Sequence, residues 1–277
     1  MEALGLWALI LLRLGVLSGE RIAFHGLGRQ RNALATTAVA YGGAAALLWL
    51  SAWATGQGYW VGQAFWPGAV YAVSFALYTA ALAEGPVSLV SAFANATAVL
   101  LFFVTPRWDV QSLLAIGLFG LGAALLVPWG RRPSKALAWM LLSDAALAVG
   151  RLLDVHNQGV ASLPYAASLF TAVLLWLAVP MTLYQRWGDV VRMVRERPGW
   201  GSIAAVSNGL AYLTVLELLR RIPATLVEAM SAWAGVIATV AGVVGFREGD
   251  GLRKVGSATL MTLGIVILLF SQSGRIG

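Results

Sequence analysis

The sequence predicts an all-α integral membrane protein of about ten transmembrane helices, arranged as two inverted five-helix repeats. Three observations predict this class. Hydrophobic residues make up 59% of the 277 residues and charged residues only 11%, whereas soluble proteins average about 25% charged residues. The apolar residues fall into runs close to the roughly 20 residues that a spanning helix needs. A pattern of charges in the first run recurs in the second half of the chain.

The recurring pattern places ionisable residues at fixed spacings in two apolar runs. The first set consists of Arg13, Glu20 and His25, spaced seven and five residues apart. The second set repeats both spacings 131 residues later, with the signs of the two charges reversed: Asp144, Arg151 and His156. The segment 86–99 likewise runs parallel to 223–236, sharing Pro, Leu, Val and Ala positions. Internal repeats of this kind are typical of transporters.

Glycine, proline and charge clusters mark where the apolar runs end. In the first half they delimit five predicted spans, at residues 3–24, 33–54, 60–83, 86–105 and 110–129. The basic segment Gly130–Lys135 then separates the halves. We therefore assign residues 1–130 to the first five-helix repeat and residues 131–277 to the second.

The second half yields five further spans, at residues 136–157, 162–184, 200–220, 223–245 and 252–272. The longest polar connection, Gln185–Pro198, alternates apolar residues with arginine at helical spacing. This connection forms either a short helix on the membrane surface or a plain basic loop. Because each half holds an odd number of spans, the two halves insert with opposite orientation, which makes the repeat an inverted one.

The distribution of lysine and arginine indicates the orientation of the chain. The connections after spans 1, 3, 5, 7 and 9 hold 13 basic residues, Arg21 among them, and the opposite side holds five, Arg151 among them. Cytoplasmic loops are enriched in basic residues, so we expect both termini outside the cytoplasm. This bias also accounts for the net charge of +7 without a nucleic-acid partner. The expected location is the bacterial cytoplasmic (inner) membrane.

Two charged pairs lie within the predicted spans. Arg13 and Glu20 share one face of a helix because they are seven residues apart, and Asp144 and Arg151 do the same in the second half. Facing helices would bring Arg13 near Asp144 or Glu20 near Arg151. Such pairs either fix the interface between the repeats or act as a gate that opens as the halves rock.

Glu228 is the sharpest candidate for a functional carboxylate. It lies one turn into the ninth span, where the first repeat has Ser91, and no basic residue occurs between Arg221 and Arg247 to neutralise it within its own helix. Ionisable groups inside a membrane are costly and mark functional sites. We expect Glu228 to bind a cationic substrate or to carry protons. The alternative is a carboxylate stabilised by the dipole at the start of its helix.

Polar and aromatic residues on neighbouring spans complete the predicted substrate-binding or proton-coupling site. Aromatic faces beside a carboxylate suit a cation or an amphipathic metabolite, although packing explains any single one of them. With Glu228 and Asp144, the predicted site comprises Tyr71, Tyr78, Asn95, Asn208, Tyr212 and Trp233.

Several other kinds of site are not indicated by the sequence. The chain has no cysteine and two histidines, which argues against a clustered metal site. It also lacks the local motifs of zinc proteases, serine hydrolases and nucleotide-binding loops. We therefore expect no cofactor and no enzymatic activity. Transport would depend on a gradient or on the substrate itself.

The chain resembles the drug/metabolite transporter superfamily, in particular proteins with two EamA-type domains. The segment Leu218–Ala234, running on to Gly245–Glu248, is similar to the family's turn between the eighth and ninth helices and to the ninth helix. Gly256 and Gly264 are similar to the glycine pair of its last helix, and Leu82–Leu89 is the counterpart in the first half. The resemblance implies ten short spans in two five-helix halves, and export in preference to uptake.

These features together predict a secondary transporter that moves a small polar or amphipathic metabolite by alternating access. The predicted partners are this small-molecule substrate and membrane lipid, with protons as a candidate coupling ion and a homodimer as a candidate assembly. Two alternatives remain open at this point. One is a lipid-headgroup flippase, and the other is a membrane scaffold that does not transport.

Overall fold

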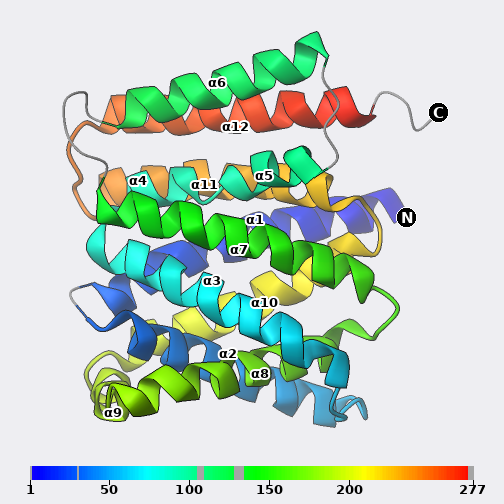
Figure 1. Ribbon diagram of the computed structural model, residues 1–277, viewed down its shortest axis with the longest axis vertical. Helices are drawn as coiled ribbons and strands as arrows, with labels where there is room; N and C mark the ends of the chain where they lie inside the picture. The colour runs from blue at the N-terminus through cyan, green and yellow to red at the C-terminus, as the bar shows by residue number, and fades with distance from the viewer. Residues whose placement is uncertain (1, 30, 105–108, 128–133, 274–277) are drawn as a thin grey trace.

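The structure of the protein is a computed structural model that describes residues 2–29, 31–104, 109–127 and 134–273. Within these residues the secondary structure consists of helices (Figure 1). In chain order they are α1 (Glu2–Gly28), α2 (Ala33–Ala54), η1 (Gly62–Ala64), α3 (Phe65–Glu84), α4 (Val87–Phe93), α5 (Ala96–Val104), α6 (Val110–Leu126), α7 (Lys135–His156), α8 (Ser162–Leu183), α9 (Trp187–Glu196), α10 (Pro198–Leu219), α11 (Ala224–Gly245) and α12 (Gly251–Ser273).

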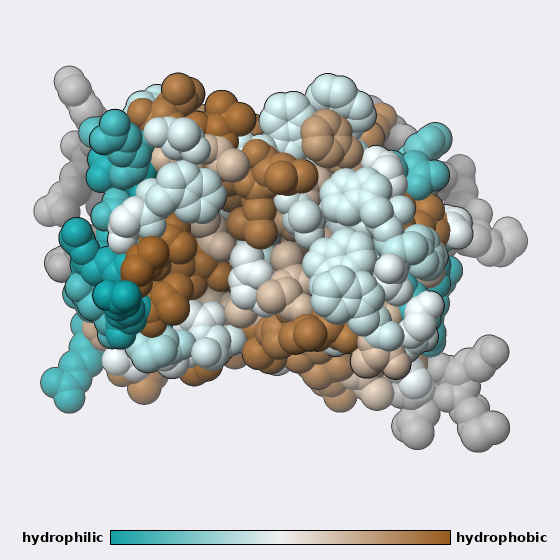
Figure 2. Space-filling view, turned by 90° about the horizontal axis from the view of Figure 1, so that it is seen from below, coloured by the Kyte–Doolittle hydropathy of each residue, from teal (hydrophilic) through white to brown (hydrophobic). Residues whose placement is uncertain are grey.

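Eight helical segments of the described chain are long and apolar enough to cross a membrane. They comprise α2, η1 with α3, α4 with α5, α7, α8, α10, most of α11 and most of α12. The set leaves out α1, which carries Arg13, Glu20 and Arg21, and α6, which has 17 residues. Figure 2 shows apolar surface across the middle of one face and hydrophilic residues toward both ends. These features indicate a multi-pass membrane protein.

The observed helices follow the predicted spans closely, with one informative difference. The predicted span at residues 86–105 is two helices, because the chain breaks at Ala94 and Asn95 between α4 and α5. The polar connection before α10 contains α9, so the helical alternative is confirmed there. The basic segment predicted to separate the halves falls largely on residues 128–133, outside the described residues.

Side-chain caps account for where several helices begin. The Asn32 side chain accepts a hydrogen bond from Ala35 N at 3.1 Å at the start of α2, and the Ser134 hydroxyl accepts one from Leu137 N at 3.3 Å at the start of α7. Such caps satisfy backbone donors that a helix start would otherwise leave unpaired. In α11 the first residue follows Pro223, whose extended backbone cannot continue a preceding helix.

The helices pack as successive layers along the longest axis of the molecule (Figure 1). At one end α6 lies beside α12, and at the other end α2 lies beside α8. Between them, α1 packs on α10 and α11, while α7 packs on α3 and on α4 and α5. Helices of the first half therefore contact mainly helices of the second half, and the largest interfaces join the two halves.

Glycines mark close contacts between the two halves. Gly122 on α6 faces Ser257 and Met261 on α12, and Gly264 on α12 faces Ala115 and Phe119 on α6. The three residues on α6 correspond to the three on α12 at a constant offset of 142 residues: 115 to 257, 119 to 261 and 122 to 264. The glycine of each helix therefore contacts equivalent positions on the other helix. A Cβ on either glycine would come within 3 Å of its neighbour, which is how small residues let helices approach closely.

Candidate binding cavity

A cavity of about 70 Å³ lies between the two halves of the protein. Its walls come from α1, α2, α3, α7, α10 and α11 and from the junction between α4 and α5. Five charged side chains line it: Arg13, Glu20, Arg21, Arg151 and Glu228. Each of the five residues is less than a tenth exposed. Charges buried to this degree need partners or a ligand, so their pairing defines what the cavity can do.

Arg151 on α7 forms the paired side of the cavity. Its Nε donates to Glu228 Oε1 on α11 at 2.5 Å, and its Nη1 lies 3.3 Å from Asp154 Oδ2 on the next turn of α7. The same Nη1 donates to the Tyr71 hydroxyl on α3 at 3.0 Å. The guanidinium carbon also lies 6.0 Å from the ring centre of Tyr71 and 5.9 Å from that of Tyr212. Arg151 is thus held by two carboxylates and two aromatic rings.

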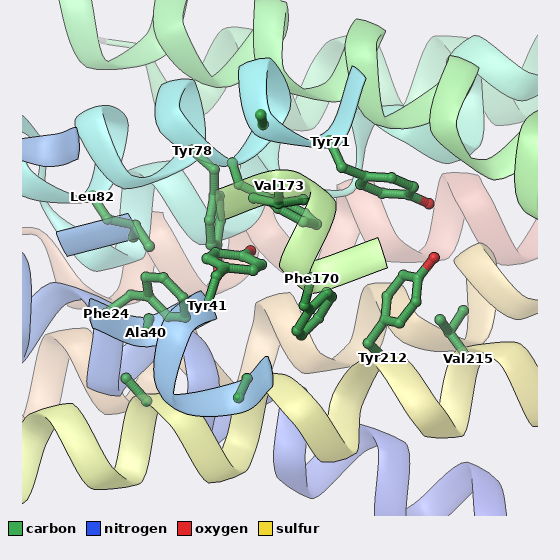
Figure 3. Close-up of a cluster of buried hydrophobic side chains, with 14 of the residues drawn as sticks. Phe24, Ala40, Tyr41, Tyr71, Tyr78, Leu82, Phe170, Val173, Tyr212 and Val215 are labelled. Atoms are coloured by element: carbon green, nitrogen blue, oxygen red, sulfur yellow. The ribbon is translucent and has the colours of Figure 1, made fainter. Parts of the chain in front are cut away.

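Asp154 collects three tyrosine hydroxyls behind this arginine. Tyr71 donates to Oδ2 at 2.5 Å, while Tyr212 and Tyr165 donate to Oδ1 at 2.7 Å and 3.1 Å. The rings of Tyr71 and Tyr212 meet edge to face with centres 5.7 Å apart (Figure 3). Because every donor comes from a different helix, the carboxylate ties α3, α8 and α10 to α7. We call Arg151, Asp154, Glu228, Tyr71, Tyr165 and Tyr212 the Arg151 cluster.

Arg13 on α1 has a different environment. Its Nε donates to the Ser231 hydroxyl at 2.9 Å, and its Nη1 donates to the backbone oxygen of Ala211 at 2.6 Å. Among the residues that the structure describes, no carboxylate lies within ion-pairing distance of Arg13, and its Nη2 makes no hydrogen bond. The guanidinium is therefore anchored through two of its nitrogens, with one donor nitrogen left at the cavity.

Glu20 lies two turns further along the same face of α1. Its carboxylate lines the cavity, and over the described part of the chain it has neither an ion pair nor a hydrogen bond. Leu17, between Arg13 and Glu20 on this face, also lines the cavity. We call Arg13, Glu20 and Arg21 the α1 charges.

Arg21 completes the α1 charges at the break between α4 and α5. It donates through Nη1 to the backbone oxygen of Ser91 at 2.8 Å and through Nη2 to Asn95 Oδ1 at 3.2 Å. The Asn95 side chain donates in turn to the backbone oxygen of Ala232 at 3.0 Å. Broken helices at mid-membrane leave backbone groups that need partners. Arg21 is such a partner, because it donates to the backbone oxygen of Ser91 in the last turn of α4.

The charged pairs predicted from the sequence are not the pairs that form. Asp144 is fully buried beside α5, where it accepts a hydrogen bond from the Thr97 hydroxyl at 2.8 Å, and its Oδ2 has no partner in the described structure. Arg13 therefore does not pair with Asp144, nor Glu20 with Arg151. The prediction assumed that α1 faces α7, whereas α1 packs on α10 and α11, and α7 packs on α3.

Two further expectations are also changed by the structure. Glu228 was expected to be the unneutralised carboxylate, but Arg151 from α7 neutralises it. Arg21 was assigned to the connection after the first span, but it is buried within α1. Arg151, which was counted on the opposite side, is buried as well. Leaving both arginines out of the count of basic residues lowers each side by one, so the difference between the two sides is unchanged.

The predicted site residues separate into three groups. Four of them line the cavity: Tyr78, Asn208, Tyr212 and Glu228. Tyr71, Asn95 and Asp144 are buried in the layer behind the lining. Trp233 is 39% exposed on α11 and is not part of the lining. Asn208 has a distinctive property, because its Nδ2 is buried without a hydrogen-bond partner among the described residues.

Several residues of the site escaped sequence reasoning, among them Asp154, Tyr165 and Tyr41. Asp154 lies three residues after Arg151, a spacing that places both on one helix face, so this pair was detectable. Tyr165 and Tyr41 carried no signal, because each lies in an apolar helix whose orientation the sequence does not fix. Tyr41 brings α2 into the cavity wall, where it stacks on Phe75 with ring centres 4.2 Å apart.

The far end of α11 carries a second link between the halves. Glu248 accepts hydrogen bonds from Val87 N at 2.7 Å and Ser88 N at 3.2 Å, and the Ser88 hydroxyl also donates to it. Lys254 Nζ lies 3.3 Å from the same carboxylate. Glu248 thus caps the first turn of α4, where the helix dipole favours an anion.

No group of three or more potential metal ligands occurs among the residues that the structure describes. The cavity lining instead combines guanidinium, carboxylate, amide and hydroxyl groups with aromatic rings: Tyr41, Phe75, Tyr78 and Tyr212. Chemically, it is suited to hold a small charged or polar molecule.

Comparisons with known proteins inform the fold. No family model matches the chain, and no curated protein matches its sequence. One solved structure, described only as "Crystal structure of protein", is similar with a TM-score of 0.66 at 15% identity, over 98% of this chain and 99% of that chain. At this identity the similarity shows that the two chains share a fold over nearly their whole lengths.

Proposed function

We propose that the protein is a secondary transporter of the bacterial cytoplasmic membrane, made of two inverted five-helix repeats. It moves a small polar or amphipathic metabolite through the central cavity by alternating access. The observation that carries the proposal is the cavity itself, because it buries five charged side chains between the two halves. A membrane scaffold has no need for ionisable groups around a central cavity, whereas a transporter uses them to bind its substrate.

The reciprocal packing of the halves supports the repeat. If α1 corresponds to α7 and α3 to α10, the contact of α1 with α10 has its counterpart in the contact of α7 with α3. Gly19 and Gly150, which share a register in the sequence, face these neighbouring helices: Gly19 faces Ser207 on α10, and Gly150 faces Tyr71 on α3. The α6–α12 interface maps onto itself in the same way. A pseudo-twofold axis produces contacts of this kind.

The links at the two ends of α11 support alternating access. The Arg151 cluster, which includes Glu228 near the start of α11, joins the halves through Tyr71 on α3, and Glu248 joins them just beyond the end of α11. A helix of 22 residues is about 33 Å long, so the two links lie near opposite ends of α11. Rocking of the halves would open one link while the other stays closed.

Solute exchange in proteoliposomes tests this function. Vesicles loaded with a mixture of unlabelled metabolites should accumulate the labelled form of the substrate by counterflow. Ala94→Leu adds volume to the cavity wall and should reduce this exchange at least tenfold, while Val73→Leu on the lipid-facing side of α3, which is 57% exposed, should not. Exchange of fluorescent lipid analogues alone would favour a flippase, and absence of all exchange would favour a scaffold.

A further inference from the structure

The short helix α9 lies at one end of the molecule, where it packs on α2 and α10 (Figure 1). It connects α8 to α10, and both of these helices are long and apolar enough to cross a membrane. A helix of 10 residues is about 15 Å long, which is too short to cross a membrane itself. Because α8 ends and α10 begins at the membrane surface, α9 lies at that surface.

The apolar residues of α9 divide between the protein and the outside. Met193 is buried in the core of the protein. Trp187, Val191 and Val194 share another face, because they are spaced four and three residues apart, and each is about half exposed. An exposed apolar face on a short surface helix suits the boundary between lipid headgroups and acyl chains.

Arg192 and Arg195 form a further side of α9, next to this apolar face. They are three residues apart and are therefore neighbours on the helix surface. Each directly follows a residue of the apolar face, Val191 or Val194, so the arginines point about 100° away from that face. When the apolar face enters the membrane, both guanidinium groups lie beside the headgroups.

The carboxylates near α9 are already paired with other arginines. Asp189 Oδ2 lies 3.3 Å from Arg186 Nη1, and Glu196 Oε2 lies 2.5 Å from Arg31 Nη2. These two are the acidic residues of segments 29–36 and 182–205, which also contain the following arginines: Arg29, Arg31, Arg186, Arg192, Arg195 and Arg197. Basic residues therefore outnumber acidic ones on this surface.

Three of these arginines have no counter-charge. Arg197 donates through Nη1 to two backbone oxygens in the last turn of α1, at 2.7 Å and 3.1 Å, where the helix dipole favours a cation. The side chains of Arg29, Arg192 and Arg195 make neither a hydrogen bond nor an ion pair among the described residues. The helices on which α9 packs do not compensate them, because α2 has no acidic residue and α10 has only Glu217, near its far end.

A cleft of about 310 Å³ beside α9 gives room for a headgroup. It lies between α9 and the residues that precede α2, and its charged lining consists of Arg31, Arg186, Arg192 and Asp189. Three arginines against one carboxylate give this lining a net charge of +2. Guanidinium groups bind phosphate oxygens through paired hydrogen bonds, so the cleft suits a phosphate group.

The opposite end of α2 provides a contrast. Trp53, Tyr59, Trp60 and Trp66 are exposed there, and segment 51–66 contains no charged residue. Uncharged aromatic residues suit the interface of any membrane, whatever the charge of its lipids. The arginines of α9 add an attraction for negative charge. The two ends of the molecule therefore differ in the lipid that they favour.

We propose that α9 lies in the headgroup layer and binds an anionic phospholipid, with the lipid phosphate at Arg192 and Arg195 and the acyl chains against the apolar face of α9. Each basic residue near an anionic membrane surface strengthens binding about fivefold, so this pair favours an anionic headgroup over one without net charge. The proposal concerns the membrane surface and does not depend on transport through the central cavity.

Brominated lipids test the proposal in proteoliposomes. The chain has no cysteine, so Val191→Cys introduces a single thiol on the apolar face of α9 for a fluorescent label. The vesicles contain equal amounts of phosphatidylglycerol and phosphatidylcholine with the same acyl chains, and only one of the two lipids is brominated. Because bromine quenches the label at short range, the two preparations together give the ratio of anionic to neutral lipid beside α9.

We expect phosphatidylglycerol to exceed phosphatidylcholine beside the Val191→Cys label by about fivefold or more. Arg192→Gln together with Arg195→Gln should bring the ratio close to one. The matched control is Lys135→Gln together with Arg253→Gln, which removes the same charge from exposed positions at the same end of the molecule (Figure 1) and should leave the ratio nearly unchanged.

A label at Trp66→Cys reports the lipid at the opposite end, where we expect a ratio close to one. This comparison needs no arginine variant, so it remains decisive even if a double variant fails to fold. Equal quenching by the two brominated lipids at Val191→Cys overturns the proposal, and so does an equal fall of the ratio in the two double variants. Quenching by neither lipid would place α9 outside the membrane and would overturn it as well.

Soluble glycerol phosphate separates a lipid from a free phosphate as the ligand. It has the phosphate group of phosphatidylglycerol without the acyl chains. Adding it to the buffer should leave the lipid ratio at Val191→Cys unchanged, because the apolar face of α9 contributes to lipid binding. A fall of the ratio to one would show that the arginines bind a soluble phosphate, and the lipid site would then be wrong.

Discussion

The Arg151 cluster and the α1 charges lie on the same cavity but differ in how their charges are satisfied. Arg151 has two carboxylate partners, and Asp154 accepts hydrogen bonds from three tyrosines. Arg13 and Glu20 have no ion pair among the described residues. A satisfied network adds stability and fixes geometry, whereas unsatisfied groups cost stability and are retained for another reason. We infer that the Arg151 cluster stabilises the fold, and we propose that the α1 charges serve binding.

The largest expected effect is the loss of stability on removing Arg151. Arg151→Gln leaves Asp154 and Glu228 buried without their counter-ion, and breaking a buried pair in this way costs about 3–5 kcal/mol. The free energy of unfolding in mixed detergent and denaturant measures it. The matched variant is Arg21→Gln, which strands no carboxylate and should cost clearly less. Equal losses in the two variants would remove the distinction between the walls.

Asp154→Asn should have the next largest effect. The three tyrosine hydroxyls then donate to a neutral acceptor, and a hydrogen bond to a charged group contributes about 1.5–3 kcal/mol. We expect a loss of about 2–3 kcal/mol in the same unfolding measurement, because Arg151 keeps Glu228 as a partner. In the double variant with Arg151→Gln the loss should be smaller than the sum of the single losses, because the two residues are in contact. Strict additivity would show that they act independently.

Single tyrosine hydroxyls should contribute less. Tyr212→Phe removes the 2.7 Å hydrogen bond to Asp154 and should cost about 1–2 kcal/mol. Tyr41→Phe is the control within the cavity, since the Tyr41 hydroxyl makes no hydrogen bond in the described structure, and it should stay within about 0.5 kcal/mol. A larger loss for Tyr41→Phe than for Tyr212→Phe would mean that the hydroxyl network does not stabilise the fold.

The smallest change in stability is expected for Glu20→Gln. This variant removes a buried charge that has no partner in the described part of the chain, so the free energy of unfolding should stay within about 0.5 kcal/mol of the unaltered protein or rise. Solute exchange should nevertheless fall at least tenfold. Glu20→Gln is thus expected to keep stability and lose exchange, whereas Arg151→Gln is expected to lose stability. A loss of several kcal/mol for Glu20→Gln would place it with the structural charges.

The sequence predicted the helices well because membrane spans depend on composition and length. The bounds predicted for the second span agree with α2, and the polar connection before the eighth span proved to contain α9. The break at Asn95 was not predictable, because no glycine, proline or charge marks it and other polar residues of the same run, such as Ser91 and Thr97, lie within helices.

The partners of the charges were harder to predict than the charges themselves. Glu228, Arg151, Arg13 and Glu20 were identified as buried ionisable groups, and all four line the cavity. Their pairing depends on which helices are neighbours, and the sequence gives no direct measure of that. Because α7 packs on α3, and α1 on α10, Arg151 pairs with Glu228, and Glu20 has no partner among the described residues.

Two-sided labelling of one cavity position tests the central claim of alternating access most directly. The chain has no cysteine, so Ser143→Cys in the cavity wall introduces a single reactive thiol. Tyr59→Cys and Leu252→Cys, at exposed positions near opposite ends of the helices, report the two sides of the vesicle. In proteoliposomes, a membrane-impermeant thiol reagent should label each control from one side only. Alternating access predicts labelling of the Ser143→Cys thiol from both sides, and labelling from only one side would contradict it.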